Sequence, residues 1–180
     1  RGASVAGTLR PGRDLPPDGD LAGKVRLYPM DIRRASAVKR VIDDARPDYI
    51  FHLAAVSSVF QSWRQPAAVM RTNAIGAINI LEAVRAGGAR PRLQMAGSSE
   101  EYGMVAAAGL PVTEDTPLMP LSPYAVSKVA QDRLAYQYFR SFNLPVVVTR
   151  AFNTTGPGRP PTYVLSRFAR EIVRVERGGR

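Results

Sequence analysis

Cysteine is absent from the 180-residue chain, and histidine occurs only once. A chain without thiols has no disulfides and no thiolate metal sites, and a single histidine without clustered carboxylates gives no basis for a metal centre. We therefore expect no metal site. The lack of cysteine is also compatible with the cytoplasm, which is the location that we expect.

Long hydrophobic runs are absent as well. No apolar stretch approaches the roughly 18 residues that are needed to span a bilayer. The basic first residues also lack the apolar segment of a signal peptide. Hydrophobic residues nevertheless make up 45% of the sequence, which is enough for one sizeable core. These features predict a folded chain that does not enter a membrane.

Lysine is scarce although the net charge is +10, because only Lys24, Lys39 and Lys128 are lysines among the 25 basic residues. The arginines occur singly or in pairs, with no dense basic run. We therefore expect no nucleic-acid partner, and general polyanion binding stays an alternative. A nucleotide diphosphate ligand would itself use part of the positive charge.

Short apolar runs alternate with longer segments of helical periodicity, a pattern that predicts β-α-β units and a parallel sheet. We expect the strands to be buried on both faces. The expected strands are Ser4–Leu9, Val25–Tyr28, Tyr49–Leu53, Arg92–Ala96 and Pro145–Arg150. The expected helices are Ala35–Ala45, Val69–Ala86, Pro123–Phe142 and Val164–Glu176.

The pattern predicts a Rossmann-type, doubly wound α/β fold from which one part is missing. No glycine-rich G-x-x-G-x-x-G turn occurs, and the first expected strand behaves like the second strand of such a fold. In the strand order 3-2-1-4-5-6 the missing first strand is central, so we expect a gap in the sheet. We expect residues 1–160 to form a partial dinucleotide-binding domain, which would also carry any catalytic residues. Residues 161–180 would begin a substrate-binding region, most of which is lacking.

The segment Ser122-Pro-Tyr-Ala-Val-Ser-Lys128 holds a tyrosine and a lysine four residues apart. On a helix, Tyr124 and Lys128 share one face. A phenol with a pKa near 10 is a poor acid or base at neutral pH, and an ammonium group held close favours the phenolate. The pair therefore predicts acid–base chemistry, although this spacing alone is weak support.

A second segment, Gly97-Ser-Ser-Glu-Glu-Tyr-Gly103, follows the expected strand Arg92–Ala96 directly. The carboxyl ends of parallel strands are where open α/β sheets bind ligands. Ser98 can hydrogen-bond a sugar hydroxyl or carbonyl there, and Glu100 is a candidate carboxylate base. The position of this segment upstream of Tyr124 favours an active-site loop over an ordinary solvated one.

These motifs together resemble the extended short-chain dehydrogenase/reductase family, in its branch of NAD-dependent nucleotide-sugar epimerases, dehydratases and reductases. The similarity covers essentially the whole chain. Besides the two segments above, it rests on three stretches: His52-Leu-Ala-Ala55, Asn73 to Glu82, and Arg150-Ala-Phe-Asn153 with Gly156-Pro-Gly158. We expect His52 to be a packed structural residue and Asn73 to brace the backbone.

The resemblance implies an enzyme with NADP as cofactor and NAD as the alternative. Ser98, Tyr124 and Lys128 match the catalytic triad: the tyrosine is the acid/base, the lysine lowers the tyrosine's pKa and grips the ribose, and the serine orients the substrate oxygen. Other positions match cofactor contacts. Asp31 and Ile32 would flank the adenine, Arg10 would pair with the 2′-phosphate, and Leu53, Ala54 and Ala55 would line the cofactor.

The resemblance also implies a nucleotide-sugar substrate, most similar to the GDP-linked ones. Ser57 and Ser58 fall where the sugar pocket begins, and Asn153 and Arg159 fall near the substrate's diphosphate. Family members commonly pair through the helices Val69–Ala86 and Pro123–Phe142, so we expect a homodimer or homotetramer.

Among reactions, Gly97–Gly103 and Arg150–Arg159 most resemble GDP-4-dehydro-6-deoxy-mannose reductases, in which a hydride from NADPH reaches the C4 ketone. The alternative is GDP-mannose 4,6-dehydratase, with Glu100 as the base at C5 of the sugar. A nucleotide-sugar 4-epimerase comes third. A non-catalytic nucleotide-binding fragment also stays open, because the phosphate-binding turn is absent.

Overall fold

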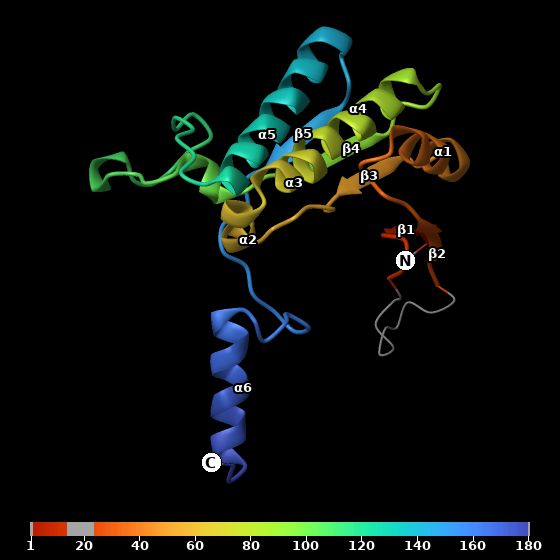
Figure 1. Cartoon of the computed structure of the whole chain (residues 1–180). Helices are drawn as coiled ribbons and strands as arrows, with labels where there is room; N and C mark the ends of the chain where they lie inside the picture. Colours follow the sequence, from red (N-terminus) through yellow and green to blue (C-terminus); the bar gives the residue numbers. More distant parts are fainter. Residues whose placement is uncertain (1, 14–23, 180) are drawn as a thin grey trace. The chain divides into compact units, whose positions relative to one another are not determined.

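The computed structural model describes residues 2–13 and 24–179, shown as a cartoon in Figure 1. The described residues form short parallel strands and helices that alternate along the chain. The strands are β1 (Ala6–Leu9), β2 (Arg26–Pro29), β3 (Tyr49–His52), β4 (Arg92–Ala96) and β5 (Val146–Thr149). The helices are α1 (Ala35–Ala45), α2 (Val59–Arg64), α3 (Pro66–Met70), α4 (Gly76–Ala86), α5 (Pro123–Phe142) and α6 (Val164–Glu176).

The strands form two parallel sheets. β1 pairs with β2 in one sheet, and β4 lies between β3 and β5 in the other. In a Rossmann-type fold of strand order 3-2-1-4-5-6, these pairings correspond to strands 2 and 3 and to strands 4, 5 and 6, and the described residues do not supply the central strand. The predicted fold class and the predicted gap in the sheet are therefore confirmed.

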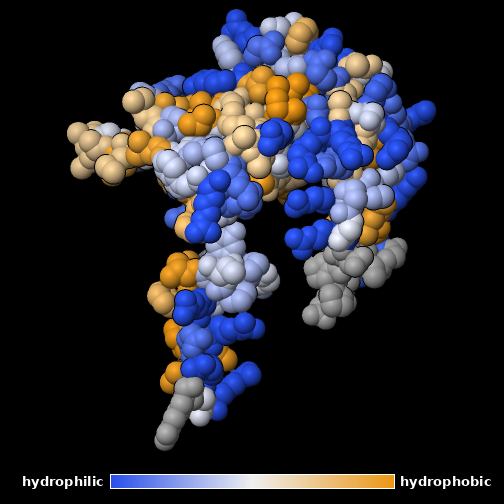
Figure 2. All heavy atoms as spheres, in the orientation of Figure 1, coloured by the Kyte–Doolittle hydropathy of each residue, from blue (hydrophilic) through white to orange (hydrophobic). Residues whose placement is uncertain are grey.

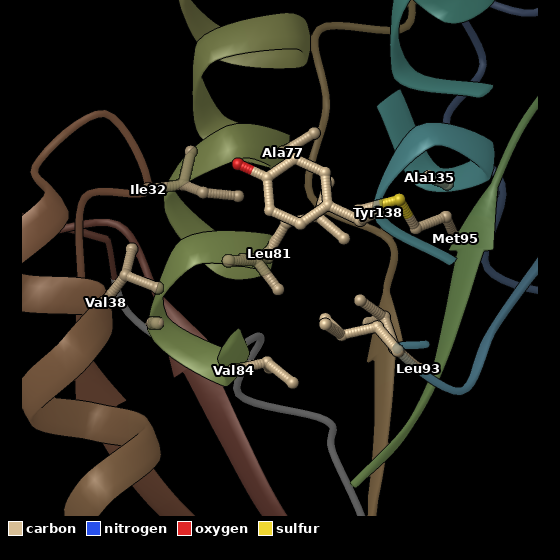
Figure 3. Close-up of a cluster of buried hydrophobic side chains, with 12 residues drawn as sticks. Ile32, Val38, Ala77, Leu81, Val84, Leu93, Met95, Ala135 and Tyr138 are labelled. Atoms are coloured by element: carbon tan, nitrogen blue, oxygen red, sulfur yellow. The ribbon is translucent and has the colours of Figure 1, made fainter. Parts of the chain in front are cut away.

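The core lies between the three-stranded sheet and the helices α1, α4 and α5, as Figure 3 shows. Leu81 from α4 and Met95 from β4 are fully buried in it. Tyr138 from α5 lies in the same cluster, and its hydroxyl donates a hydrogen bond to Glu82. The helical spacing of apolar residues along α4 produces this buried face, as expected for a helix packed on one side.

The prediction that the strands are buried on both faces is wrong for the described residues. Tyr49 and Phe51 of β3 are 60% and 70% exposed, and Val147 of β5 is 63% exposed. The residues that alternate with them in β3, Ile50 and His52, point into the covered side. Since side chains alternate across a strand, one face of this sheet contacts the helices, and the side chains of the other face are exposed among the described residues.

Most predicted boundaries agree with the structure, and α1, α5, α6 and β4 have the predicted limits. Ser122 caps α5 by accepting a hydrogen bond from the Ala125 N–H at 3.1 Å, and Pro123 follows at the first helical position. The predicted helix Val69–Ala86 is instead divided. Helix α3 ends at Met70, a single π-helical turn spans Arg71–Ile75, and α4 begins at Gly76.

The chain forms two compact units, Arg1–Arg150 and Ala151–Arg180. In the second unit, α6 has apolar and basic side chains on different sides (Figure 2), and none of its residues is buried. The roles predicted for residues 1–160 and 161–180 stay predictions. No helix in the described part of the chain is long and apolar enough to cross a membrane.

Candidate active site

Helix α5 brings Tyr124 and Lys128 to the carboxyl end of β4, one helical turn apart. The Lys128 Nζ donates to the backbone oxygen of Ala96, the last residue of β4, at 2.6 Å. It also donates to Gln131 Oε1 at 3.2 Å. Tyr124 and Lys128 are both buried. The predicted tyrosine–lysine pair therefore lies where β4 ends.

Burial determines the electrostatics of Lys128. Loss of solvent lowers the pKa of its ammonium group to about 8, and the negative charge of Glu101 opposes that shift. His52 is buried on the neighbouring strand β3, where burial and the nearby Lys128 lower the pKa of its imidazole to about 4. His52 is thus neutral at pH 7 and packed, as predicted for a structural residue.

Ser98 begins a single 3₁₀ turn, Ser99–Tyr102, directly after β4. Its Oγ accepts a hydrogen bond from the Glu100 N–H at 3.3 Å, and its own N–H donates to Glu101 Oε1 at 2.7 Å. Ser98 is buried, whereas Glu100 is exposed. This turn places Ser98 at the strand end from which Ala96 contacts Lys128.

Arg150 makes hydrogen bonds to the segment between Gly103 and Leu121, which follows this turn, and to the elements beside it. Its Nε donates to Asp132 Oδ2 on α5 at 3.0 Å. Its Nη1 donates to the Tyr102 hydroxyl at 3.1 Å and to the Glu114 backbone oxygen at 2.9 Å. Arg150 therefore links the end of β5, helix α5 and the segment between Gly103 and Leu121.

Asn73 braces the backbone, as the sequence predicted. It lies in the π-helical turn, where its Oδ1 accepts from the Val56 N–H at 2.8 Å and its Nδ2 donates to the Val56 oxygen at 3.1 Å. The same Nδ2 donates to Ser127 Oγ on α5 at 2.9 Å. These bonds tie the segment after β3 to the helix that carries Tyr124 and Lys128.

The predicted adenine-flanking pair follows β2. Asp31 accepts hydrogen bonds from the Arg33 guanidinium at 2.6 to 3.1 Å and from the Arg33 N–H at 3.0 Å. These bonds lower the pKa of the Asp31 carboxyl to about 2. Ile32 is buried against Gly76 of α4, where an added Cβ would lie 3.0 Å from the Ile32 side chain. Arg10 is exposed directly after β1.

The remaining predicted residues fall in two places. After β3, Leu53, Ala54, Ser57 and Ser58 are exposed and Ala55 is half-buried. Ser58 caps α2 by accepting from the Gln61 N–H at 3.1 Å. Asn153 and Arg159 belong to the separate unit Ala151–Arg180, where the Arg159 guanidinium lies 4.1 Å from the centre of the Tyr163 ring. The structure thus gathers Ser98, Glu100, Tyr124 and Lys128 in the first unit.

Sequence reasoning missed the polar groups beneath this cluster. Glu101, Gln131 and Asp132 are buried there. Two signals point to Glu101 and Asp132. Ser98-x-x-Glu101 is a capping-box pattern, and Asp132 lies four residues after Lys128 on the same helical face.

The chain is similar to known proteins in sequence and in structure. Residues 13–180 match the family model described as GDP-mannose 4,6 dehydratase. A GDP-6-deoxy-D-mannose reductase of Pseudomonas aeruginosa is 37% identical over 132 residues, which are 73% of this chain and 43% of that protein. A GDP-mannose 4,6-dehydratase of Yersinia enterocolitica is 33% identical over 154 residues, which are 84% of this chain and 41% of that protein.

Among solved structures, that of RMD from Pseudomonas aeruginosa complexed with NADPH matches with a TM-score of 0.77 and 33% identity. The match covers 86% of this chain and 54% of the other. The chain spans less than half the length of the two curated relatives named above.

Proposed function

The chain belongs to the GDP-mannose 4,6 dehydratase family, and from this membership we propose that its protein is an NAD(P)-dependent enzyme acting on a GDP-linked sugar. The reaction that we propose is reduction of the C4 ketone of GDP-4-dehydro-6-deoxy-mannose. The observation that carries the proposal is that Lys128 bonds the last residue of β4, while Ser98 caps the turn after that strand and Tyr124 lies one helical turn before Lys128. We also propose a cytoplasmic location, which cell fractionation tests.

The residues at the strand ends suit a dinucleotide cofactor, which would supply the hydride for the reduction. Arg33 orients the Asp31 carboxylate and lowers its pKa, and the carboxylate oxygens suit the amino group of an adenine as hydrogen-bond acceptors. Ala54 and Ala55 offer little bulk after β3, so a flat ring can approach the backbone there. We propose that Arg10 pairs with the 2′-phosphate of NADP, because an arginine after β1 suits a phosphate.

In the proposed reaction Tyr124 donates its phenolic proton to the C4 oxygen of the sugar. Lys128 has three N–H donors, and two of them bond Ala96 and Gln131, which leaves the third for a ribose hydroxyl. The Ser98 Oγ accepts the Glu100 N–H, so its own proton points elsewhere and suits the substrate oxygen. Proton transfer by a positioned side chain contributes about 10²- to 10⁴-fold to a rate.

The test uses the natural full-length protein and two separate incubations, one with GDP-mannose and NADP and one with GDP-4-dehydro-6-deoxy-mannose and NADPH. The proposal expects loss of NADPH absorbance with the keto sugar, and Tyr124→Phe should abolish that loss. Tyr136→Phe is the matched control, since Tyr136 lies on the same helix but is 53% exposed. NADPH oxidation that persists in Tyr124→Phe would contradict the assigned role.

The second candidate is GDP-mannose 4,6-dehydratase. The exposed Glu100 in the Ser98 turn favours it, because a base at C5 must reach the substrate. Conversion of GDP-mannose to a keto sugar without net change of cofactor, lost in Glu100→Gln, would replace the reductase by the dehydratase.

A further inference from the structure

The carboxyl group of Glu101 is buried, although burying such a group costs free energy. Its side chain is fully buried. One oxygen, Oε1, accepts the Ser98 N–H at 2.7 Å, and the other, Oε2, lies 3.6 Å from Arg150 Nε without a hydrogen-bond partner in the described part of the chain. Burying a carboxyl group is costly unless it is paired and hydrogen-bonded, and an apolar side chain would fill the same space at lower cost.

The backbone around Glu101 is shaped to receive it. A Cβ added to Gly97 would lie 2.6 Å from Glu101 Oε1 and 2.8 Å from the Thr149 backbone oxygen. The Gly97 N–H already donates to that Thr149 oxygen at 2.6 Å. Glycine at position 97 therefore lets the carboxyl group lie against the chain between the ends of β4 and β5.

Arg150 holds this carboxyl group from the other side. Its guanidinium donates hydrogen bonds to Asp132 and to the Tyr102 hydroxyl. These bonds hold the guanidinium in place beside Glu101. Burial and the charge of Asp132 raise the pKa of the Glu101 carboxyl, while the Ser98 N–H, Arg150 and Lys128 favour its ionised form. The carboxylate in turn supports the charged state of Lys128. Glu101 thus interacts with both Ser98 and Lys128.

We propose that Glu101 is a positioning residue, whose buried carboxyl group fixes the backbone of Ser98 and is itself held by Arg150 at the end of β5. The proposal rests on the substrate-orienting role proposed for Ser98 above. Glu101 does not touch the reacting atoms. It determines where the Ser98 hydroxyl lies relative to Tyr124 and Lys128.

Two substitutions separate its contributions in the natural full-length protein. Glu101→Leu keeps the bulk and removes both oxygens, whereas Glu101→Gln keeps one acceptor for the Ser98 N–H and turns a donor amide toward Arg150. The matched control is Glu114→Gln, which removes a glutamate charge from an exposed side chain and keeps the Glu114 backbone oxygen that Arg150 contacts.

The first measurement is hydrogen exchange at the Ser98 amide in the cofactor-free protein. A hydrogen bond to a charged group contributes about 1.5–3 kcal/mol, so Glu101→Leu should speed this exchange about 10- to 100-fold. Glu101→Gln should speed it about fivefold, because only one of the two contacts survives, and Glu114→Gln should leave it unchanged. Unchanged Ser98 exchange in both Glu101 variants would overturn the proposal, and if the leucine variant does not fold, the glutamine variant decides.

The second measurement is steady-state kinetics with the keto sugar and NADPH. Glu101→Leu should lower kcat about 10- to 100-fold and leave the KM for NADPH within about twofold, since only the orientation of the substrate oxygen is lost. Equal proportional losses in kcat and in the fraction of folded protein would show a merely structural role. If the unaltered protein turns over no nucleotide sugar but the exchange result holds, the proposed function fails and the positioning of Ser98 stands.

Discussion

We propose that Arg10 determines the choice between NADP and NAD. Its guanidinium is exposed after β1, where it can pair with the 2′-phosphate that only NADP carries. We expect Arg10→Ala to raise the KM for NADPH about 10- to 30-fold and to leave the KM for NADH nearly unchanged. Steady-state kinetics with both cofactors checks this, with Arg40→Ala on the exposed side of α1 as the control. Equal losses with NADPH and NADH would contradict the assignment.

The buried Lys128 makes the stability of the folded protein depend on pH. Its pKa is about 8 in the folded protein and 10.5 when it is unperturbed, so between these values the unfolded chain binds more protons. Stability therefore rises with pH through this window. Relative to Lys128→Met, the wild-type protein should gain about 3 kcal/mol of unfolding free energy between pH 7 and pH 11. Urea unfolding of both proteins across that range measures it, and a constant difference would contradict the prediction.

At the scale of single residues, the sequence predicts groups whose chemistry shows in a short motif. Tyr124 and Lys128 are marked by their spacing of four together with the Ser98 segment, and the hydrogen bonds of Asn73 agree with the expected structural role of that residue. Glu101 and Asp132 were not predicted as site residues. Their partner Arg150 lies 49 residues after Glu101 and 18 residues after Asp132, and pairing over such separations depends on the fold. The capping-box pattern and the spacing from Lys128 mark Glu101 and Asp132 as local polar positions, but neither signal identifies Arg150 as their partner.

At the scale of the elements, the backbone conformation of the segment after the Ser98 turn requires a glycine at position 103. Gly103 has a φ of +66°, and a Cβ added there would lie 1.9 Å from the Met119 backbone oxygen. We expect Gly103→Ala to destabilise the protein by about 2–3 kcal/mol, because a backbone atom must move and the left-handed conformation disfavours alanine. Gly88→Ala is the control, since no atom lies within 4 Å of its added Cβ and its φ is not in that region. Chemical denaturation of both variants compares them, and equal stabilities would show that the segment adapts freely.

The elements that the sequence predicts well are those with their own end signals. Helix α5 begins at Ser122-Pro123, and its predicted limits are those in the structure. The division between α3 and α4 was missed because the apolar periodicity continues through Arg71–Ile75. What changes there is the hydrogen-bond pattern, which lets Asn73 reach Val56 and Ser127. A π-helical turn is set by such tertiary contacts and often lies at a functional site.

For the whole molecule, the parallel strand order and the gap in the sheet could be predicted, because both follow from the order of the elements along the chain. The exposure of one face of the three-stranded sheet among the described residues could not be predicted. Tyr49, Phe51 and Val147 are apolar and exposed, and hydropathy alone reads such residues as buried. Which face of a strand is covered depends on elements that the strand's own sequence does not specify.

The last prediction concerns assembly, which the family resemblance places on α4 and α5. Figure 2 shows apolar side chains gathered over this part of the molecule. The exposed ones include Ile75 beside α4 and Val126, Tyr136 and Phe139 on α5. A symmetric dimer would bury the same patch on both protomers, so one substitution changes the interface at two positions. We expect the protein to be a dimer or a tetramer, and Tyr136→Asp to raise the dimer dissociation constant at least about tenfold, because it buries an unpaired charge in the interface.

Sedimentation velocity over a range of concentrations measures that constant for the full-length protein. Ser141→Asp is the matched control, because it adds the same charge to an exposed polar position near the end of the same helix. Equal weakening by both variants would point to a general effect of negative charge and not to the apolar patch. A wild-type protein that stays monomeric at high concentration would contradict the pairing of α4 and α5 altogether. If the wild-type protein is a dimer and the Tyr136→Asp variant is a monomer with unchanged activity, one protomer holds the whole proposed catalytic cluster.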